Sequence, residues 1–167
     1  MARRPVLAYP DPRLCRPASV VEHFDASLAA LADDLRDTLA ATPGIALSAP
    51  QLGDLRQVVV IDVPADGVAP AFYVNPRILS RSAWGFVEES CLSVPGASGL
   101  VLRATRLRVA AQTLDGTPFA CDLDGMHAVC LQHECDHLAG KLFVTRLWFL
   151  RRLLWHAGAG RRLRKAA

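Results

Sequence analysis

Two histidines four residues apart, His133 and His137, flank Glu134 in the segment HECDH. On a helix, residues four apart lie on one face a turn apart, so both imidazoles can reach one metal ion. The alternative is a core helix with two histidines satisfied by hydrogen bonds and an exposed glutamate. Both histidines continue an apolar face, however, and burying two imidazoles requires partners for every ring nitrogen. The pattern therefore favours a metal site, with Glu134 placed to act on a water molecule there.

A hydrolytic metal site also needs a third protein ligand and an open coordination position. Downstream of His137 the only histidine is His156, and no Asp or Glu follows, so the third ligand should come from upstream. Cys91 is the best candidate, because a thiolate that follows Glu88 and Glu89 needs a metal or another cation nearby. An inert, buried cysteine in a strand is an equally weighted alternative for Cys91 on this reasoning.

Leucines at positions 28, 31, 35 and 39 repeat at helical spacing after Asp25, which suits an N-cap, and Pro43 ends this predicted helix. Segments 57–63 and 72–74 are rich in β-formers, the second ending at Asn75-Pro76. Segments 107–111 and 117–123 flank Asp115-Gly116, a strong hairpin signal. A second helix is predicted at about 125–138. Helix, short strands and helix predict an α+β class.

The charge of the chain is divided unevenly. Residues 1–137 hold 11 basic and 16 acidic residues, whereas eight basic residues and no acidic residue follow from Leu138 onward. The length of 167 residues suits one domain. Five cysteines, no apparent secretory leader and no apolar run long enough for a bilayer predict a cytoplasmic protein without a membrane partner. Its cysteines should be free, metal-bound or catalytic rather than disulfide-bonded.

Three segments in order resemble motifs of the peptide deformylase family. Residues 44–51 (GIALSAPQ) resemble Gly-x-Gly-x-Ala-Ala-x-Gln, and residues 89–93 (ESCLS) resemble Glu-Gly-Cys-Leu-Ser. Residues 132–140 (QHECDHLAG) match Gln-His-Glu-x-Asp-His-Leu-x-Gly at every fixed position. The resemblance extends from about Val6 to Leu147. It implies short mixed or antiparallel sheets packed around a central helix that carries the two histidines, with further helices near the N-terminus and the C-terminus.

The resemblance also implies a reaction, the removal of the N-formyl group from formyl-methionyl nascent polypeptides with release of formate. Three residues become ligands of one divalent metal ion, Fe(II) in the native enzyme with zinc, nickel or cobalt as replacements: Cys91, His133 and His137. Glu134 becomes the general acid and base, while Gln51 and the backbone N–H of Leu92 stabilise the oxyanion. Five residues become the lining of the substrate channel, where an extended peptide pairs with strand edges: Gly44, Ile45, Ala46, Glu89 and Cys130.

Cys130 lies one turn before His133 on the same helix face, and we expect it to pack there. Cys135 points about 200° away from His133 on an ideal helix and should not share the site. Cys15 and Cys121 carry no functional signal.

Two positions depart from the family motifs, Ala46 and Ser90, where the family has glycine. Glycine often serves where φ is positive or where backbones approach closely, so a side chain there predicts a strained or narrowed groove. This leaves a second hypothesis, a deformylase-like protein with weak or no turnover that binds ribosomes or formylated peptides. A third, a metallopeptidase of another specificity, is disfavoured by a cysteine ligand.

The basic end of the chain, residues 148–167, is expected to be a C-terminal helix or tail outside a catalytic domain of residues 1–147. One interpretation packs its apolar side on the domain and leaves its arginines in solvent. The other is an anionic partner, the ribosome, whose RNA phosphates suit seven positive charges from Arg146 onward. Gly158 and Gly160 disfavour a membrane-surface helix. We expect a monomer.

Overall fold

The computed structural model describes residues 4–63 and 71–147. In this part of the chain, one antiparallel sheet is combined with α-helices and short 3-10 helices, so the predicted α+β class is confirmed. The strands are β1 (Ala46–Ser48), β2 (Val58–Ile61), β3 (Ala71–Ser90), β4 (Ser98–Gln112) and β5 (Pro118–Asp124). The α-helices are α1 (Ala26–Ala40) and α2 (Gly125–Leu138), and the 3-10 helices are η1 (Pro12–Cys15), η2 (Ala49–Leu52) and η4 (Phe143–Arg146).

The sheet has the order β1-β2-β3-β4-β5, and every neighbouring pair is antiparallel. The prediction that all strands are short was wrong, because β3 has 20 residues and β4 has 15. Asn75-Pro76 does not end a strand; the register shifts between Val74 and Arg77, and β3 continues beyond this irregularity. Asn75 has a φ of 51°. Its side-chain oxygen accepts from the Val21 backbone N–H, and its side-chain nitrogen donates to the Val21 carbonyl and to Oε1 of Gln112. Such a bulge bends a strand without ending it.

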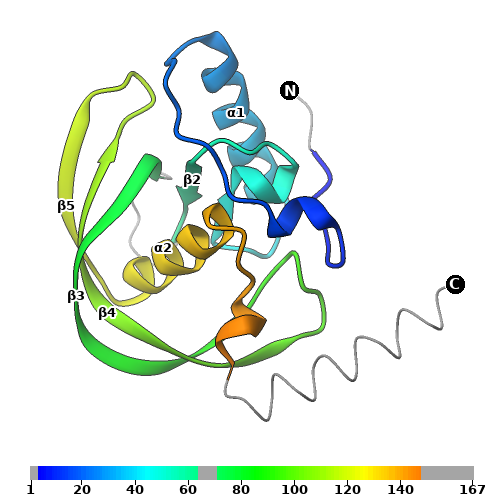
Figure 1. Ribbon diagram of the computed structural model, residues 1–167, viewed down its shortest axis with the longest axis vertical. Helices are drawn as coiled ribbons and strands as arrows, with labels where there is room; N and C mark the ends of the chain where they lie inside the picture. The colour runs from blue at the N-terminus through cyan, green and yellow to red at the C-terminus, as the bar shows by residue number, and fades with distance from the viewer. Residues whose placement is uncertain (1–3, 64–70, 148–167) are drawn as a thin grey trace, which may run out of the picture.

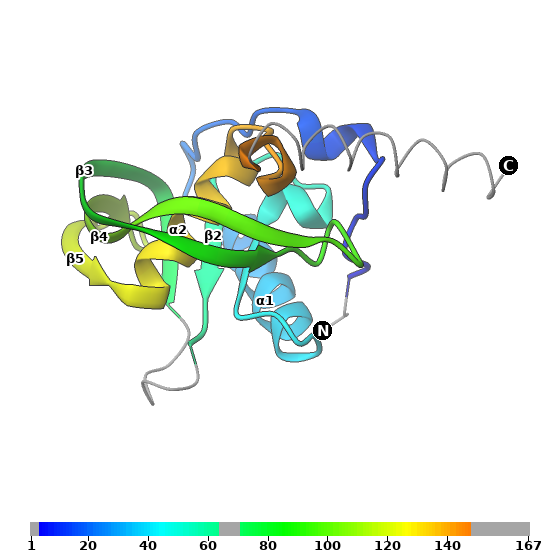
Figure 2. The same ribbon diagram turned by 90° about the horizontal axis from the view of Figure 1, so that it is seen from below.

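The sheet bends around α2, which lies inside the curve of β3, β4 and β5 (Figure 1). Seen from below, the ribbon formed by β3 and β4 crosses the molecule beside α2 (Figure 2). One side of α2 packs its apolar residues, Ala128, Leu131 and Leu138 among them, against sheet residues such as Val59 and Val109. The burial of α2 against β1, β2 and β4 fixes the position of any group that the helix carries.

The helix α1 begins at the predicted N-cap, where the Asp25 carboxylate accepts hydrogen bonds from the backbone N–H groups of Ser27 and Leu28. Its four periodic leucines are buried, as predicted, and form a second core with β1 and β2. Gly140 follows α2 with a φ of 68°, and a Cβ at this position would lie 2.6 Å from the carbonyl oxygen of Cys15. A glycine is therefore required where the end of α2 meets η1.

The predicted C-terminal helix, residues 148–167, lies outside the described residues. Among residues 4–63 and 71–147, no helix has the length and apolar character that crossing a membrane requires. The described chain ends at Leu147, whose side chain packs against Gly99 of β4.

Candidate metal centre and active site

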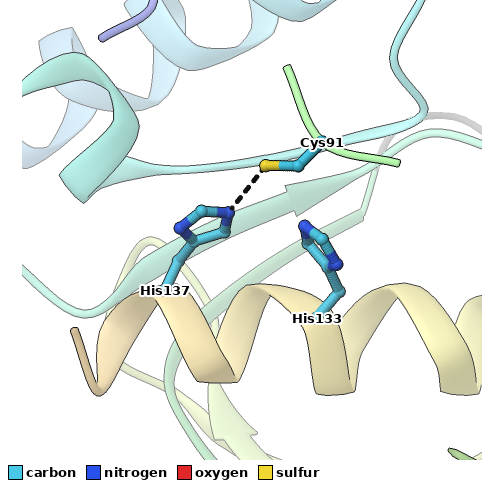
Figure 3. A group of neighbouring side chains, drawn as sticks. All are labelled: Cys91, His133 and His137. Carbon is cyan, nitrogen blue, oxygen red and sulfur yellow. Dashed lines mark hydrogen bonds between the residues drawn. The ribbon is translucent and has the colours of Figure 1, made fainter. Parts of the chain in front are cut away.

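Three metal-ligating side chains converge between the end of β3 and the face of α2. The Sγ atom of Cys91 and one ring nitrogen from each of His133 and His137 lie within 4.8 Å of one another. Sγ of Cys91 is 3.2 Å from Nε2 of His137, and both histidines project from α2 toward the cysteine (Figure 3). A thiolate and two imidazoles converging in this way suit a transition-metal ion with one coordination position left for a reactant.

Glu89 fixes the orientation of one of these rings. Its Oε2 atom lies 2.9 Å from Nδ1 of His133, and the carboxylate is 5% exposed. Because an ionised carboxylate only accepts hydrogen bonds, Nδ1 of His133 carries the proton and donates it. The Nε2 lone pair is then directed away from Glu89 and is available to a metal ion.

In the metal-free protein, the surroundings of the two histidines shift their pKa values in opposite directions. Burial lowers the pKa of His133, but hydrogen bonds to Cys91 and Glu89 outweigh it and raise this pKa to about 10. Burial and the charge of His133 lower the pKa of His137 to about 3. Burial raises the pKa of Glu89, yet hydrogen bonds from His133 and Arg103 prevail and lower it to about 2. In the metal-free site, His133 is therefore protonated and positively charged at neutral pH, and Glu89 beside it is ionised.

Glu134 lies in the same site and has one carboxylate oxygen without a hydrogen-bond partner among the described residues. This atom is Oε2, and the residue is 3% exposed. Burial is the largest effect on Glu134 and raises its pKa. A buried carboxylate oxygen without a partner is costly, and a polar molecule that enters the site would satisfy it. Nδ1 of His137 is a second buried polar atom without a partner in the same part of the structure.

The amide of Gln51 has its orientation fixed by its neighbours. Oε1 accepts hydrogen bonds from the backbone N–H of Ser48 at 2.9 Å and from its hydroxyl at 3.1 Å. Nε2 must then point the other way, where it donates to Oγ of Ser93 at 3.1 Å and lies 3.8 Å from Sγ of Cys91. Gln51 belongs to η2 and is 2% exposed. Its side-chain N–H therefore points toward the metal centre from a buried position.

A cavity of about 590 Å³ opens beside these groups. The predicted residues that line it are Gly44, Ile45, Ala46, Gln51, Glu89, Cys91, Leu92, Cys130, His133 and Glu134. His137 is not part of this lining and is buried at 1% exposure next to Cys91. Burial raises the pKa of the Cys130 thiol to about 12, so this thiol is uncharged at neutral pH. Cys135 packs against the apolar core instead.

The backbone at Ala46 and Ser90 does not need glycine. In the described part of the chain, positive φ at a residue other than glycine occurs at Asn75 and Ala83 only. Ala46 pairs with Ile61 in β1, and Ser90 pairs with Ser98 at the end of β3. The predicted backbone strain at these positions is therefore wrong. Both residues line the cavity, and the predicted narrowing of the groove stays a prediction.

Sequence reasoning missed the charged residues that support the site from behind. Arg103 of β4 is 2% exposed and contacts both Glu89 and Asp136. Asp136 in turn pairs with Arg146 of η4. Asp136 lies inside the histidine segment, but alternation along β4 gave no sign that one of its arginines is buried. Only tertiary structure brings these four residues together.

Comparisons with known proteins agree with this geometry. Residues 3–152 match the family described as polypeptide deformylase. The peptide deformylase of Chromobacterium violaceum is 44% identical over 147 residues, which is 88% of each chain, and that of Alkalilimnicola ehrlichii is 43% identical over 91% of this chain and 86% of its own. The crystal structure of a peptide deformylase from Legionella pneumophila superimposes with a TM-score of 0.88 at 41% identity and covers 99% of both chains. With this match along nearly the whole sequence, the chain belongs to the polypeptide deformylase family.

Proposed function

We propose that this chain performs its reaction with one metal ion held by Cys91, His133 and His137. The reaction is that of the family: hydrolysis of the N-formyl group at the N-terminus of formyl-methionyl nascent polypeptides, with release of formate. The convergence of three donor atoms within 4.8 Å is the observation that supports the ligand assignment. A thiolate with two imidazoles suits Fe(II), zinc, nickel or cobalt better than magnesium or calcium. Of these we propose Fe(II) as the native ion, which the resemblance to the family implies.

A bound metal ion would supply a Lewis acid, which makes water more acidic and the formyl carbonyl more electrophilic. Glu134 accepts the proton of the attacking water through Oε2, the carboxylate oxygen that has no hydrogen-bond partner among the described residues, and later delivers it to the leaving amine. The water oxygen forms a bond to the formyl carbon, the carbon–nitrogen bond breaks, and formate and a free amino group result. Nε2 of Gln51 and the backbone N–H of Leu92 donate hydrogen bonds to the oxygen on which negative charge develops.

The cavity beside these groups is the proposed peptide channel. Gly44, Ile45 and Ala46 line one wall, and β1, to which Ala46 belongs, is the first strand in the sheet order, with β2 as its paired neighbour. An extended peptide can add its backbone to such an edge. Glu89 and Cys130 line the same channel, and the neutral thiol of Cys130 suits an uncharged methionine side chain.

An anaerobic metal analysis coupled to a deformylation assay tests this proposal. The full chain, loaded with Fe(II), should bind one ion and release formate from formyl-Met-Ala-Ser. Cys91→Ala should lose the ion and the activity, while Cys135→Ala, a control that packs away from the site, should keep both. A Cys91→Ala variant that retains a full equivalent of metal would contradict the ligand assignment.

The same assay decides between turnover and mere binding of formylated peptides. The regular backbone at Ala46 and Ser90 favours an active enzyme. If the loaded chain shows no turnover but the double variant Ala46→Gly/Ser90→Gly does, the weak-turnover hypothesis is correct and the active one is wrong.

We further propose a catalytic domain of residues 1–147 and a basic tail of residues 148–167 that binds the ribosome through RNA phosphates. The seven positive charges from Arg146 onward support this, and a cytoplasmic monomer working on nascent chains is consistent with it. Co-sedimentation with ribosomes should be salt-sensitive and should be lost on deletion of residues 150–167. Co-sedimentation that survives this deletion rules out docking through the tail, and size-exclusion chromatography tests the monomer.

A further inference from the structure

Four charged side chains form a continuous chain of contacts from η4 to the metal centre. Arg103 donates from Nε to Oε1 of Glu89 at 2.6 Å and from Nη2 to Oε2 at 3.0 Å. Its remaining nitrogen, Nη1, donates to Oδ2 of Asp136 at 2.8 Å. Arg146 pairs with both oxygens of Asp136 through Nε and Nη2. Glu89 ends the chain of contacts at Nδ1 of His133.

The buried part of this cluster does not balance its own charge. Glu89 and Asp136 are two carboxylates at 5% and 6% exposure, and Arg103 is one guanidinium at 2% exposure. Arg146 supplies the second positive charge, and its side chain is 43% exposed. A buried carboxylate that loses its partner keeps its desolvation penalty and takes hydrogen bonds from other donors.

Without Arg146, Asp136 would compete with Glu89 for the hydrogen bonds that Arg103 donates. A guanidinium has a fixed planar fork, and Arg103 uses it bidentately on Glu89 while reaching Asp136 with one nitrogen. Without Arg146, both oxygens of Asp136 would turn to Arg103. Arg103 would move toward Asp136, and its hydrogen bonds to Glu89, the residue that orients the ring of His133, would weaken.

We propose that Arg146 is a positioning residue for the metal centre. By pairing with Asp136 it leaves Arg103 to hold Glu89, and Glu89 in turn holds His133 with its Nε2 atom toward the metal position. Arg146 ends η4, next to Leu147, which packs on Gly99. This inference rests on the proposed metal site.

Titration of the metal-free full chain with Co(II) tests the proposal through the visible spectrum, which reports both affinity and ligand geometry. Residues that orient metal ligands typically contribute 10- to 100-fold to affinity. Arg146 acts on such a residue, Glu89, only through Asp136 and Arg103, so Arg146→Gln should have a smaller effect and weaken Co(II) binding about 3- to 10-fold. Its bands should also shift or broaden. The matched control is Arg108→Gln, which removes an exposed arginine of β4 that pairs with Asp122 of β5 at 2.6 Å. Binding by Arg146→Gln within twofold of this control overturns the proposal.

The double variant Arg146→Gln/Asp136→Asn tests the route. If Arg146 acts through Asp136, its substitution should have no further effect once Asp136 is an amide. An equal loss of affinity in both backgrounds overturns the route and with it the proposal. Thermal unfolding of each metal-free variant shows that the compared proteins are folded, and the single comparison with Arg108→Gln decides if the double variant does not fold. Failure of the unsubstituted chain to bind Co(II) would instead count against the proposed metal site itself.

Discussion

Exchanging Gln51 for glutamate replaces one hydrogen-bond donor by an acceptor at a buried position beside the metal centre. The retained oxygen can still accept from the backbone N–H of Ser48, which is 2.9 Å from Oε1 of Gln51 in the unsubstituted chain, and from the Ser48 hydroxyl. The lost N–H faced Ser93 and Cys91. The Ser93 hydroxyl can rotate and donate to the new oxygen, because a hydroxyl is both donor and acceptor.

Gln51→Glu has one effect on folding and another on the chemical step. Exchanging one hydrogen bond for another changes the free energy of unfolding by about 1 kcal/mol, and burying a carboxyl group at a position that is 2% exposed lowers that free energy further. Loss of one donor to a developing oxyanion lowers kcat by about 100- to 1000-fold, or roughly 2.7–4 kcal/mol of transition-state stabilisation. Variant protein that is folded and carries its metal ion should therefore still show a severely slowed chemical step.

Formate release from formyl-Met-Ala-Ser, with the metal content of each sample measured, checks this prediction. Ser93→Ala is the matched control, because it removes the hydroxyl that accepts from Nε2 of Gln51 but keeps both contacts to Ser48 that orient the amide. It should keep kcat within about threefold, less than one oxyanion donor contributes. A fully metallated Gln51→Glu enzyme that also stays within this range would refute the role of Gln51.

Three further perturbations separate the other groups of the site. Glu134→Gln should keep the metal and lower kcat by about 10²- to 10⁴-fold in the formate assay, because the proton acceptor is lost; a loss below tenfold in metallated protein would exclude Glu134 as the base. The apparent affinity of the metal-free chain for Co(II) should rise up to about tenfold per pH unit between pH 6 and 8, because a metal must displace the proton held on His133 by its raised pKa of about 10. Titrations that give the same affinity across this range would contradict it. Ala46→Gly/Ser90→Gly should alter kcat/KM by less than about fivefold, since neither backbone conformation needs glycine, and a larger gain would mean that these side chains obstruct the channel.

The helices were predictable because their signals are local. Four leucines at helical spacing and an N-cap aspartate define α1, and both features appear where predicted. The course of β3 was not predictable in this way. Asn75-Pro76 is a strong break signal, yet the side chain of Asn75 is bonded to Val21, 54 residues away in sequence. Contacts over that distance decide that the chain makes a bulge and continues as a strand.

In the site, too, only the residues that a local pattern brings together were predictable from the sequence. Helix periodicity alone brings His133 and His137 together, whereas Cys91 could be placed only through a resemblance, since nothing local distinguishes it from a buried structural cysteine. Arg103 carried no signal at all, because an arginine that alternates with apolar residues in a strand is expected to face solvent. Its burial depends on two carboxylates from other elements, β3 and α2.

Two glutamates flank His133 in space, and their surroundings divide the work between them. Glu89 accepts hydrogen bonds from His133 and Arg103, which lower its pKa to about 2 and keep it ionised. The ionised carboxylate holds the ring of His133 in one orientation. Glu134 has an oxygen without a partner, and burial raises its pKa, so it can gain and lose a proton during a reaction. Opposite pKa shifts on neighbouring carboxyl groups identify which one carries the proton and which one remains charged. Arg103 donates to Glu89 and not to Glu134, and this contact keeps Glu89 ionised. The assignment of the proton-carrying role to Glu134 therefore depends on Arg103, a buried residue that belongs to none of the three sequence motifs.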